Sequence, residues 1–364
     1  MKRVTIAGPG GYDRLELETV PDLAPHPGEV SVRTDAVGVN FADSIIRMGL
    51  YESAKKYAGW PITPGFEFSG IVDAVGSKDS RWKVGDEVFG VTRFGGYATQ
   101  VVVPEHQLFA QPQKWSKYES AAFPAVFLTA YYALVDLANV RKGQTILVHS
   151  AAGGVGTALL QLARVLGLRA VGVVGSSKKV QTARELGAAA VIDKSTQDLW
   201  REAKAFAPNG YDVVLDANGL ETLGKSYDHL ASPGKLVVYG FHSMFRKAGA
   251  SQGGEGKNLL RRLWGDGRPD YLKLAADFLR TPRFNPLDLT NLNRSILAFN
   301  LSYLFDNTEF LAEAMVRMLS WVEHGDLIPP TVTTFRLQDV ADAHRAIESG
   351  TTVGKLVLTT SEGR

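Results

Sequence analysis

The chain has 364 residues, of which 45% are hydrophobic and 21% charged, proportions typical of a globular protein with room for two compact domains. Forty basic and 38 acidic side chains leave a formal net charge of +2, which is too small to indicate a nucleic-acid-binding surface over the whole molecule. There is no Cys, so disulfides, thiolate nucleophiles and cysteine-ligated metals are excluded; with no apolar membrane span and no export signal, we expect a cytoplasmic protein.

Short β-type runs separated by Gly and Pro occupy the first 125 residues, for example residues 29–34, 70–76 and 98–104. They predict a β-rich, barrel-like unit. From about residue 127, apolar segments alternate between strand and helix patterns, at 145–150, 155–166, 170–175, 178–186, 190–193, 211–217 and 235–240. Repeated strand–helix–strand units predict a parallel doubly wound sheet, and therefore an α/β protein.

Residues 242–293 interrupt this alternation with a Gly-rich, basic stretch and an amphipathic segment, and we interpret them as an insertion. The chain then shows an apolar run at 295–301, a helix near 308–323 and a β-type ending at 354–358 that can rejoin the first unit. We therefore predict one domain from residues 1–126 and 306–364, and a second domain from residues 127–305 that contains the insertion.

A glycine-rich turn joins the apolar strand at 145–150 to the following helix. It reads Ala152, Gly153, Gly154, Val155 and Gly156. Glycine permits a sharp turn and a close approach of backbone N–H groups to a pyrophosphate, whose charge the positive end of the helix dipole favours. Because the turn lies inside a strand–turn–helix unit, it predicts a dinucleotide site in preference to an ordinary turn.

The end of the second strand of this unit indicates which dinucleotide is bound. An NAD site expects an Asp or Glu there for the ribose 2′-hydroxyl, whereas this chain has Ser176, Ser177, Lys178 and Lys179. Small hydroxyls and cations suit a 2′-phosphate, so NADPH is favoured over NADH. The alternative is that the lysines only solvate the start of a helix, although cations at a helix N-terminus oppose its dipole.

Several motifs outside the glycine turn support a family resemblance. They are GVNFAD at 38–43, PGFEFSG at 64–70, KVGDEV at 83–88, LTAY at 128–131 and FNLSYL at 299–304. With these motifs, nearly the whole chain resembles the zinc-free, zeta-crystallin-type quinone oxidoreductases of the medium-chain dehydrogenase/reductase superfamily, and within them the vesicle amine transport protein-like branch. The resemblance implies a Rossmann domain plus a β-rich, GroES-like barrel domain.

The same resemblance implies an activity and a set of binding residues. The family reduces the C=C bond of α,β-unsaturated carbonyl compounds (enones, enoyl-CoA thioesters or quinones) with NADPH held between the domains, usually as a homodimer. Beyond the glycine turn, Ser176 and Lys179, further residues are expected at the cofactor: Thr129, Lys194, Asn218, Tyr239, Phe299 and Lys355. Asn300 and Tyr303 follow the last apolar strand of the sheet, whose carboxyl end faces the ligand crevice, so we expect them there as well. For Thr129 a helix-start hydroxyl is the alternative, and the run at 295–299 is equally suited to a dimer-edge strand.

No metal is expected. Zinc-dependent relatives carry a Cys and a His where this chain has Asn40 and Phe66, and none of the seven His shows ligand spacing. Without a metal, the negative charge on the substrate oxygen needs hydrogen-bond donors.

Two residues are the candidate donors. Asn40 either donates to the substrate oxygen or caps the helix that follows. Tyr51 either donates or relays a proton, or else packs as an aromatic side chain. We expect Asp43 to be a helix-start residue and Glu67 to pair with a cation such as Arg47.

Two broader alternatives stay open from the sequence. The chain can be a catalytically idle NADPH-binding protein that acts as a sensor or a partner platform, because fold does not determine function. The insertion can order around the phosphates of a CoA substrate, or it can be a solvated loop. Its cations are Arg246, Lys247, Lys257, Arg261, Arg262 and Arg268.

Overall fold

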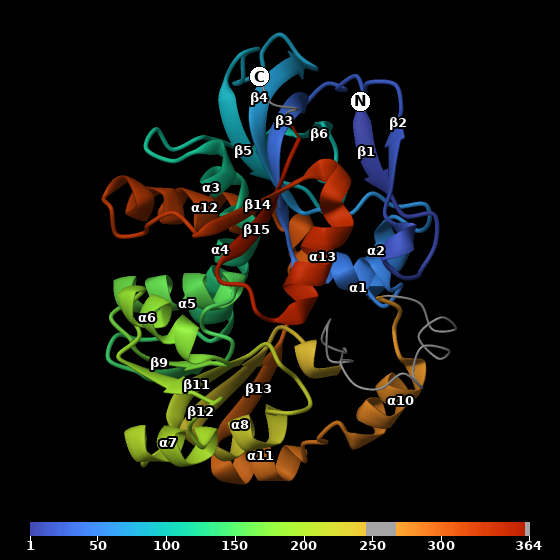
Figure 1. Cartoon of the computed structure of the whole chain (residues 1–364). Coiled ribbons are helices and arrows are strands. Elements are labelled where there is room, and N and C mark those ends of the chain that lie inside the picture. Colours follow the sequence, from blue (N-terminus) through green and yellow to red (C-terminus); the bar gives the residue numbers. More distant parts are fainter. Residues whose placement is uncertain (245–266, 361–364) are drawn as a thin grey trace.

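The computed structural model describes residues 1–244 and 267–360, which form two main sheets, one above the other in Figure 1. The lower sheet has six parallel strands in the order β10-β9-β8-β11-β12-β13. These strands are β8 (Thr145–Val148), β9 (Arg169–Val174), β10 (Ala190–Asp193), β11 (Tyr211–Asp216), β12 (Leu230–Val238) and β13 (Arg294–Ala298). The order is that of a Rossmann fold, so the predicted doubly wound sheet is confirmed.

Helices connect these strands and cover the sheet: α5 (Gly154–Val165), α6 (Val180–Glu185), α7 (Leu199–Phe206) and α8 (Leu223–Asp228). Because both faces are covered, the strands are continuous apolar runs. In β8, Leu147 packs into the apolar cluster on one face, while Ile146 and Val148 pack into the cluster that also contains Leu159 of α5. The glycine turn is thus held between a buried strand and a buried helix.

The upper sheet is mostly antiparallel, in the order β14-β15-β3-β4-β5-β7, with β6 paired to β3. Its strands are β3 (Glu29–Val39), β4 (Glu67–Val75), β5 (Glu87–Val91), β6 (Gln100–Pro104), β7 (Leu108–Ala110), β14 (Val332–Arg336) and β15 (Lys355–Thr359), and a separate hairpin pairs β1 (Lys2–Thr5) with β2 (Glu16–Thr19). The final strand, β15, pairs with β3, which confirms that the end of the chain rejoins the first domain. This is the GroES-like domain.

The remaining described helices lie around the two sheets (Figure 1): α1 (Phe41–Arg47), α2 (Glu52–Tyr57), α3 (Lys117–Ala121), α4 (Pro124–Tyr131), α10 (Tyr271–Arg280), α11 (Pro286–Leu292), α12 (Thr308–Glu323) and α13 (Val340–Ser349). Shorter helical turns are η1 (Tyr12–Arg14), η2 (Glu105–Gln107), η3 (Tyr132–Leu137), η4 (Ser177–Lys179), η5 (His242–Met244), η7 (Leu301–Asp306) and η8 (Leu337–Asp339). The described part of the predicted insertion consists of η5, α10 and α11, between β12 and β13.

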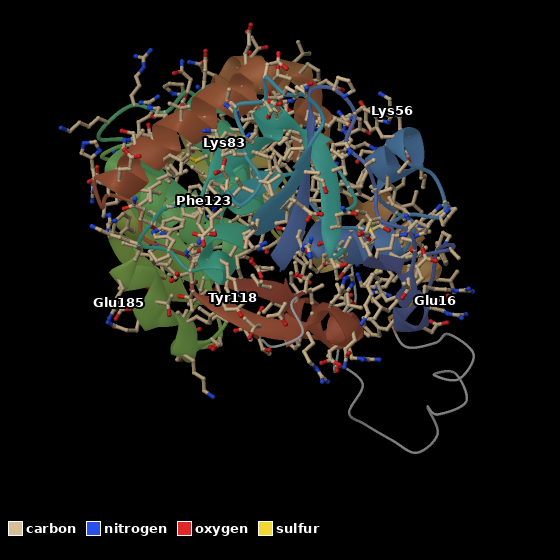
Figure 2. The ribbon with its side chains drawn as sticks, turned by 90° about the horizontal axis from the view of Figure 1, so that it is seen from above. Glu16, Lys56, Lys83, Tyr118, Phe123 and Glu185 are labelled. Atoms are coloured by element: carbon tan, nitrogen blue, oxygen red, sulfur yellow. The ribbon has the colours of Figure 1, made fainter. Side chains whose placement is uncertain are left out.

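The two domains share an apolar cluster. Phe89 and Phe123 from the upper part pack in one cluster with Leu159 of α5 and Met315 of α12. Figure 2, which looks down on the upper sheet, shows Glu16 and Lys56 projecting at the rim, whereas Phe123 is fully buried. The predicted domain boundaries, at residues 126/127 and 305/306, fall inside α4 and η7, and we keep them as a proposal.

Candidate active site

The glycine turn has the geometry that its residues predict. Gly153 caps α5, a helix of 12 residues whose first turn contains Gly154, Val155 and Gly156. A Cβ added to Gly156 would lie 2.3 Å from the carbonyl oxygen of Ser150, so only glycine fits at this position. The first N–H groups of α5 therefore lie at the end of a tightly wound turn, where a helix dipole favours an anion.

Gly175, which precedes Ser176, and Lys194 lie close together at the ends of neighbouring strands. Val174 of β9 pairs with Asp193 of β10, and a Cβ on Gly175 would lie 3.8 Å from Cε of Lys194. Hydrogen bonds from Ser177 and Ser195 hold the pKa of the Asp193 carboxyl below its usual value. Asp193 is thus engaged by hydroxyl groups beside the lysine.

Lys179 extends in another direction. Its Nζ donates a hydrogen bond of 2.8 Å to the carbonyl oxygen of Gly350, which ends α13. The sequence grouped Lys179 with Ser176, and the structure brings Lys194 to the Ser176 turn by strand pairing.

Asn218 is brought to the glycine turn by a loop that a buried carboxylate organises. Asp216, at the end of β11, accepts hydrogen bonds from the backbone N–H groups of Asn218 (2.8 Å) and Gly219 (3.0 Å). The side-chain oxygen of Asn218 then accepts a bond of 2.9 Å from Oγ of Ser150. The ends of β8 and β11 are joined in this way at the edge where ligands bind in parallel sheets.

Aromatic side chains follow the next two strands. Tyr239 comes after β12 and Phe299 after β13, with ring centroids 6.4 Å apart, and Tyr132 lies 4.9 Å from Phe299. Burial raises the pKa of Tyr239, so its hydroxyl stays protonated.

Thr129 lies near the end of α4 and not at its start. Its hydroxyl donates to the carbonyl oxygen of Ala125 at 2.7 Å. The helix-start alternative for Thr129 is therefore wrong.

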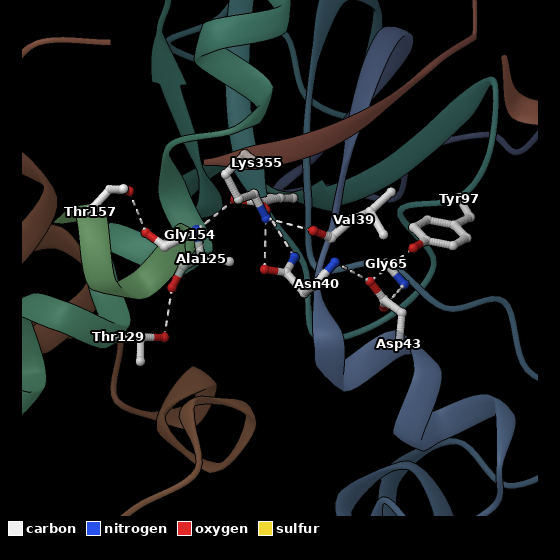
Figure 3. A network of polar contacts seen from close by, with 11 residues as sticks. Val39, Asn40, Asp43, Gly65, Tyr97, Ala125, Thr129, Gly154, Thr157 and Lys355 are labelled. Carbon is white, nitrogen blue, oxygen red and sulfur yellow. Dashed lines mark hydrogen bonds and ion pairs between the residues drawn. The ribbon is translucent and has the colours of Figure 1, made fainter. Parts of the chain in front are cut away.

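A buried ion pair between Lys355 and Glu67 lies beside the glycine turn (Figure 3). Nζ of Lys355 donates to Oε1 of Glu67 (2.6 Å), to Oδ1 of Asn40 (2.8 Å) and to the carbonyl oxygen of Val39 (2.9 Å). The other oxygen of Glu67 accepts from the N–H of Ala125 at 2.7 Å. One lysine thus connects β15, β3 and β4, and a Cβ on Gly154 would lie 3.0 Å from its Cδ.

The prediction that Glu67 pairs with Arg47 was wrong: the cation beside Glu67 is Lys355. Arg47 pairs instead with Glu348 of α13 (2.6 Å), and it donates to the carbonyl oxygens of Gly10 and Gly267. Both ion pairs are buried, and the spacing of residues along the chain does not distinguish between them. The C-terminal residues Glu348 and Lys355 reach these sites only through the packing of α13 and β15.

Asn40 uses its backbone and its side chain for different purposes. The backbone N–H donates to Oδ2 of Asp43 at 2.8 Å, which forms the start of α1. The side-chain Nδ2 donates to Oε1 of Glu67 at 2.9 Å, and Oδ1 accepts from Lys355. Asp43 is therefore the helix-start residue that the sequence predicts, and the amide of Asn40 is held at both of its polar atoms.

Tyr51 and Asn300 meet across the two domains. The hydroxyl of Tyr51 donates to Oδ1 of Asn300 at 2.7 Å, and burial raises the pKa of that hydroxyl. Asn300 also accepts from Ser302, whose Oγ donates to Oγ of Ser53 at 2.6 Å. The sequence interpretation missed Ser53 and Ser302; the only signal was that Ser302 lies in the motif at 299–304.

An aromatic side chain occupies the place where zinc-dependent relatives carry a His. The ring of Phe66 lies 6.0 Å from the ring of Tyr51 and 5.7 Å from that of Phe94. Within residues 1–244 and 267–360, no group of three or more His, Asp or Glu side chains has the geometry of a metal site.

Comparison with known proteins identifies the family. The model of the alcohol dehydrogenase GroES-like domain matches residues 26–113, and that of the zinc-binding dehydrogenases matches residues 186–358. The synaptic vesicle membrane protein VAT-1 homolog of Danio rerio is 34% identical over 360 residues, which cover 99% of this chain and 70% of that protein. The chain belongs to the medium-chain dehydrogenase/reductase superfamily.

Solved structures of this superfamily agree with the fold. The Escherichia coli quinone oxidoreductase complexed with NADPH superimposes with a TM-score of 0.81 at 27% identity, covering 99% of this chain and 100% of that one. The CurK enoyl reductase gives a TM-score of 0.80 at 26% identity, covering 99% of each chain. This medium-chain dehydrogenase/reductase is thus an oxidoreductase of the quinone oxidoreductase and enoyl reductase type. None of its described helices is long and apolar enough to cross a membrane.

Proposed function

We propose that the chain is a cytoplasmic, zinc-independent reductase that uses NADPH to reduce the C=C bond of an α,β-unsaturated carbonyl compound. The observation that carries this proposal is the position of the Asn40 amide. It is fixed by Lys355 and Glu67, and Lys355 in turn lies against Gly154 of the glycine turn. A hydrogen-bond donor is therefore connected to the glycine turn through one lysine side chain.

The residues present fit NADPH. The glycine turn has no room for a Cβ at Gly156, as the tight strand-to-helix turn of a dinucleotide site requires. Ser176, Lys194 and Lys179 would hold the 2′-phosphate; Lys194 follows β10 and lies near Gly175, the residue before Ser176. The nicotinamide half would contact residues at the ends of β11, β12 and β13 and on α4, namely Asn218, Tyr239, Phe299, Asn300 and Thr129. Lys355 would add positive charge behind the turn.

When bound, NADPH supplies a hydride to the β-carbon of the substrate. Asn40 would stabilise the negative charge that develops on the carbonyl oxygen. One hydrogen of its NH₂ group is directed to Glu67, and the other is available to a substrate oxygen. Because two partners already hold the amide, little reorganisation is needed in the transition state.

Tyr51 would deliver the proton that completes the reduction at the α-carbon. A tyrosine hydroxyl is protonated at neutral pH, so Tyr51 carries the proton that this step needs. In the structure this proton is directed to Asn300. Transfer to the substrate breaks that hydrogen bond, and solvent then restores the proton on Tyr51.

Enones, quinones and enoyl-CoA thioesters all fit this chemistry. A role for the basic insertion in binding CoA concerns Arg246, Lys247, Lys257, Arg261 and Arg262, which lie outside the described residues. Arg268 is described and lies 3.9 Å from the carboxylate of Asp13.

Following nicotinamide absorbance with NADPH and a panel of enones, quinones and enoyl-CoA thioesters tests the proposed activity. Turnover of at least one class, unaffected by chelators, is the expected result. An NADPH complex that turns over none of them would favour the sensor or partner-platform alternative.

The coenzyme preference gives a first prediction. We expect Lys194→Ala to weaken NADPH binding by about 10- to 100-fold, since a charge-assisted hydrogen bond to a phosphate contributes roughly 1.5–3 kcal/mol. The affinity for NADH, which lacks that phosphate, should stay nearly unchanged. Lys179→Ala should have a smaller effect on NADPH, because Lys179 already donates to Gly350. Isothermal titration of both coenzymes measures these differences.

A surface lysine of the same domain serves as the control. Lys204 on α7 donates to the carbonyl oxygen of Pro208, and Lys204→Ala should leave both affinities unchanged. Equal affinities of the parent protein for NADH and NADPH would contradict the assignment of the 2′-phosphate site.

We also propose that the chain forms a homodimer through β13. This strand is at the edge of the six-stranded sheet, with β12 as its neighbour, and unpaired edges are commonly covered. Exposed apolar side chains lie on the two helices that precede it: Leu272, Phe278 and Leu279 on α10, and Leu287 and Leu292 on α11. Sedimentation equilibrium should give a dimer for the parent, and a monomer there would refute this assembly.

A further inference from the structure

Asp43 connects three parts of the GroES-like domain through one buried carboxylate (Figure 3). Its Oδ2 accepts hydrogen bonds from the backbone N–H of Asn40 (2.8 Å) and from the hydroxyl of Tyr97 (2.9 Å). Its Oδ1 accepts from the backbone N–H of Gly65 (3.0 Å). The start of α1 is therefore bound both to the turn before β4 and to the segment before β6.

The turn at Gly65 leaves little freedom for this carboxylate. Gly65 has a φ of +101°, and a Cβ there would lie 2.6 Å from the ring of Tyr97 and 2.7 Å from its backbone nitrogen. The N–H of Tyr97 also donates to the carbonyl oxygen of Pro64 at 2.9 Å. The Gly65 turn and Tyr97 thus interlock, and both present a donor to Asp43.

A second pair of contacts connects Tyr97 to α1 through the ring of His344. The hydroxyl of Tyr97 lies 3.4 Å from Nε2 of His344, and Nδ1 of the same ring lies 3.3 Å from Oγ of Ser44. Burial lowers the pKa of His344, so the imidazole is neutral at pH 7. Because Ser44 follows Asp43 in α1, the contacts form a closed ring that holds the helix start against α13.

We propose that Asp43 is a positioning residue for the reductase: through the backbone N–H of Asn40 it sets the direction in which the Asn40 amide faces the substrate. The inference rests on the proposed function. The amide has two restraints, from Lys355 and Glu67 at its polar atoms and from Asp43 at its backbone. Loss of the second restraint moves the donor without removing it, and small displacements of a donor reduce transition-state stabilisation.

The ionisation of Asp43 supports this role. Burial raises the pKa of its carboxyl to about 7, although hydrogen bonds from Asn40 and Tyr97 oppose the shift. The charged or titratable groups that act on it are Tyr97, Lys355 of β15 and Tyr51, which precedes α2. Tyr97 in turn faces Glu67 of β4 and His344 of α13. A carboxylate accepts all three hydrogen bonds, whereas a neutral acid must donate one, so the bond to Asn40 weakens as the pH falls through about 7.

A double-mutant cycle on kcat tests the proposal. In Asp43→Ala, the backbone N–H of Asn40 loses its acceptor, and we expect kcat to fall by about 10- to 100-fold at pH 8. The affinity for NADPH should change by less than about threefold. In the Asn40→Ala background, Asp43→Ala should lower kcat by less than about threefold, because coupled residues are not additive. Because the bond to Asn40 is stronger when Asp43 is ionised, kcat of the parent should rise as the pH increases through about 7, and this rise should be absent in Asp43→Asn.

A readout that does not depend on activity distinguishes this proposal from the proposed function. In the parent, the backbone amide ¹⁵N and ¹H shifts of Asn40 should titrate near pH 7, and Asp43→Asn should abolish that titration. The control is Ser116→Ala, which removes the cap of α3 and should lower the melting temperature but not kcat.

Multiplicative effects in the cycle, or an Asn40 amide that does not titrate in the parent, would overturn the role of Asp43. If no substrate is reduced, the proposed reductase function is wrong. Asp43 then has no role in catalysis, even if the Asn40 amide titrates near pH 7.

Discussion

Asn40→Ala is expected to lower kcat for an enone by about 100- to 1,000-fold, the range observed when one donor to a developing oxyanion is removed. The amide is held by Lys355 at 2.8 Å and Glu67 at 2.9 Å, so it is preorganised before substrate binds. The dissociation constant of NADPH should change by less than about threefold, because the effect is on the transition state and not on the ground state. Steady-state kinetics together with coenzyme titration separates the two quantities.

An exposed asparagine provides the control for this substitution. Asn291 lies on the surface of α11, and Asn291→Ala should leave kcat unchanged. A decrease in kcat of less than about threefold in Asn40→Ala would remove Asn40 from the chemistry and leave Tyr51 as the candidate donor.

Lys355→Met is expected to lower the free energy of unfolding by about 3–5 kcal/mol, the usual cost of removing one partner from a buried ion pair. Its ammonium group donates to three oxygens, among them Glu67 at 2.6 Å, and both side chains are almost completely buried. Without the lysine, the carboxylate of Glu67 has to lose its charge or remain buried without its cation. Urea unfolding followed by circular dichroism measures the difference.

Two further variants make this result specific. Adding Glu67→Gln to Lys355→Met should recover much of the lost stability, since it removes the unpaired charge. Lys117 forms a comparable ion pair with Asp35 at 3.1 Å, but 37% of the lysine side chain is exposed, and Lys117→Met should cost no more than about 1 kcal/mol. Similar losses for both lysine variants would show that burial does not determine the contribution of the Lys355 pair.

Local patterns in the sequence were enough to predict the architecture and the position of the glycine turn. Apolar periodicity is a local property, so the strands predicted at 145–150, 170–175, 190–193 and 211–217 and the helix at 155–166 lie close to where they occur. The helices α7, α8, α11 and α13 and the strand β14 were not predicted. The turn at 152–156 was recognisable because it requires glycine at particular positions, and Gly156 indeed has no room for a Cβ. The absence of Cys and the Phe at position 66 are also properties of the sequence, and they predicted a site without zinc ligands.

The meeting of side chains that are distant along the chain depended on the tertiary fold. Lys355 contacts Asn40 because β15 pairs antiparallel with β3, with Leu356 opposite Val39, although 315 positions separate the lysine from the asparagine. In the same way, the packing of α13 places Glu348 beside Arg47, and Glu67 forms its ion pair with Lys355. Strand register and helix packing are set by the sum of many apolar contacts along whole elements, whereas the motifs in the sequence describe only neighbours along the chain. The partners of individual charges therefore follow from the assembled fold.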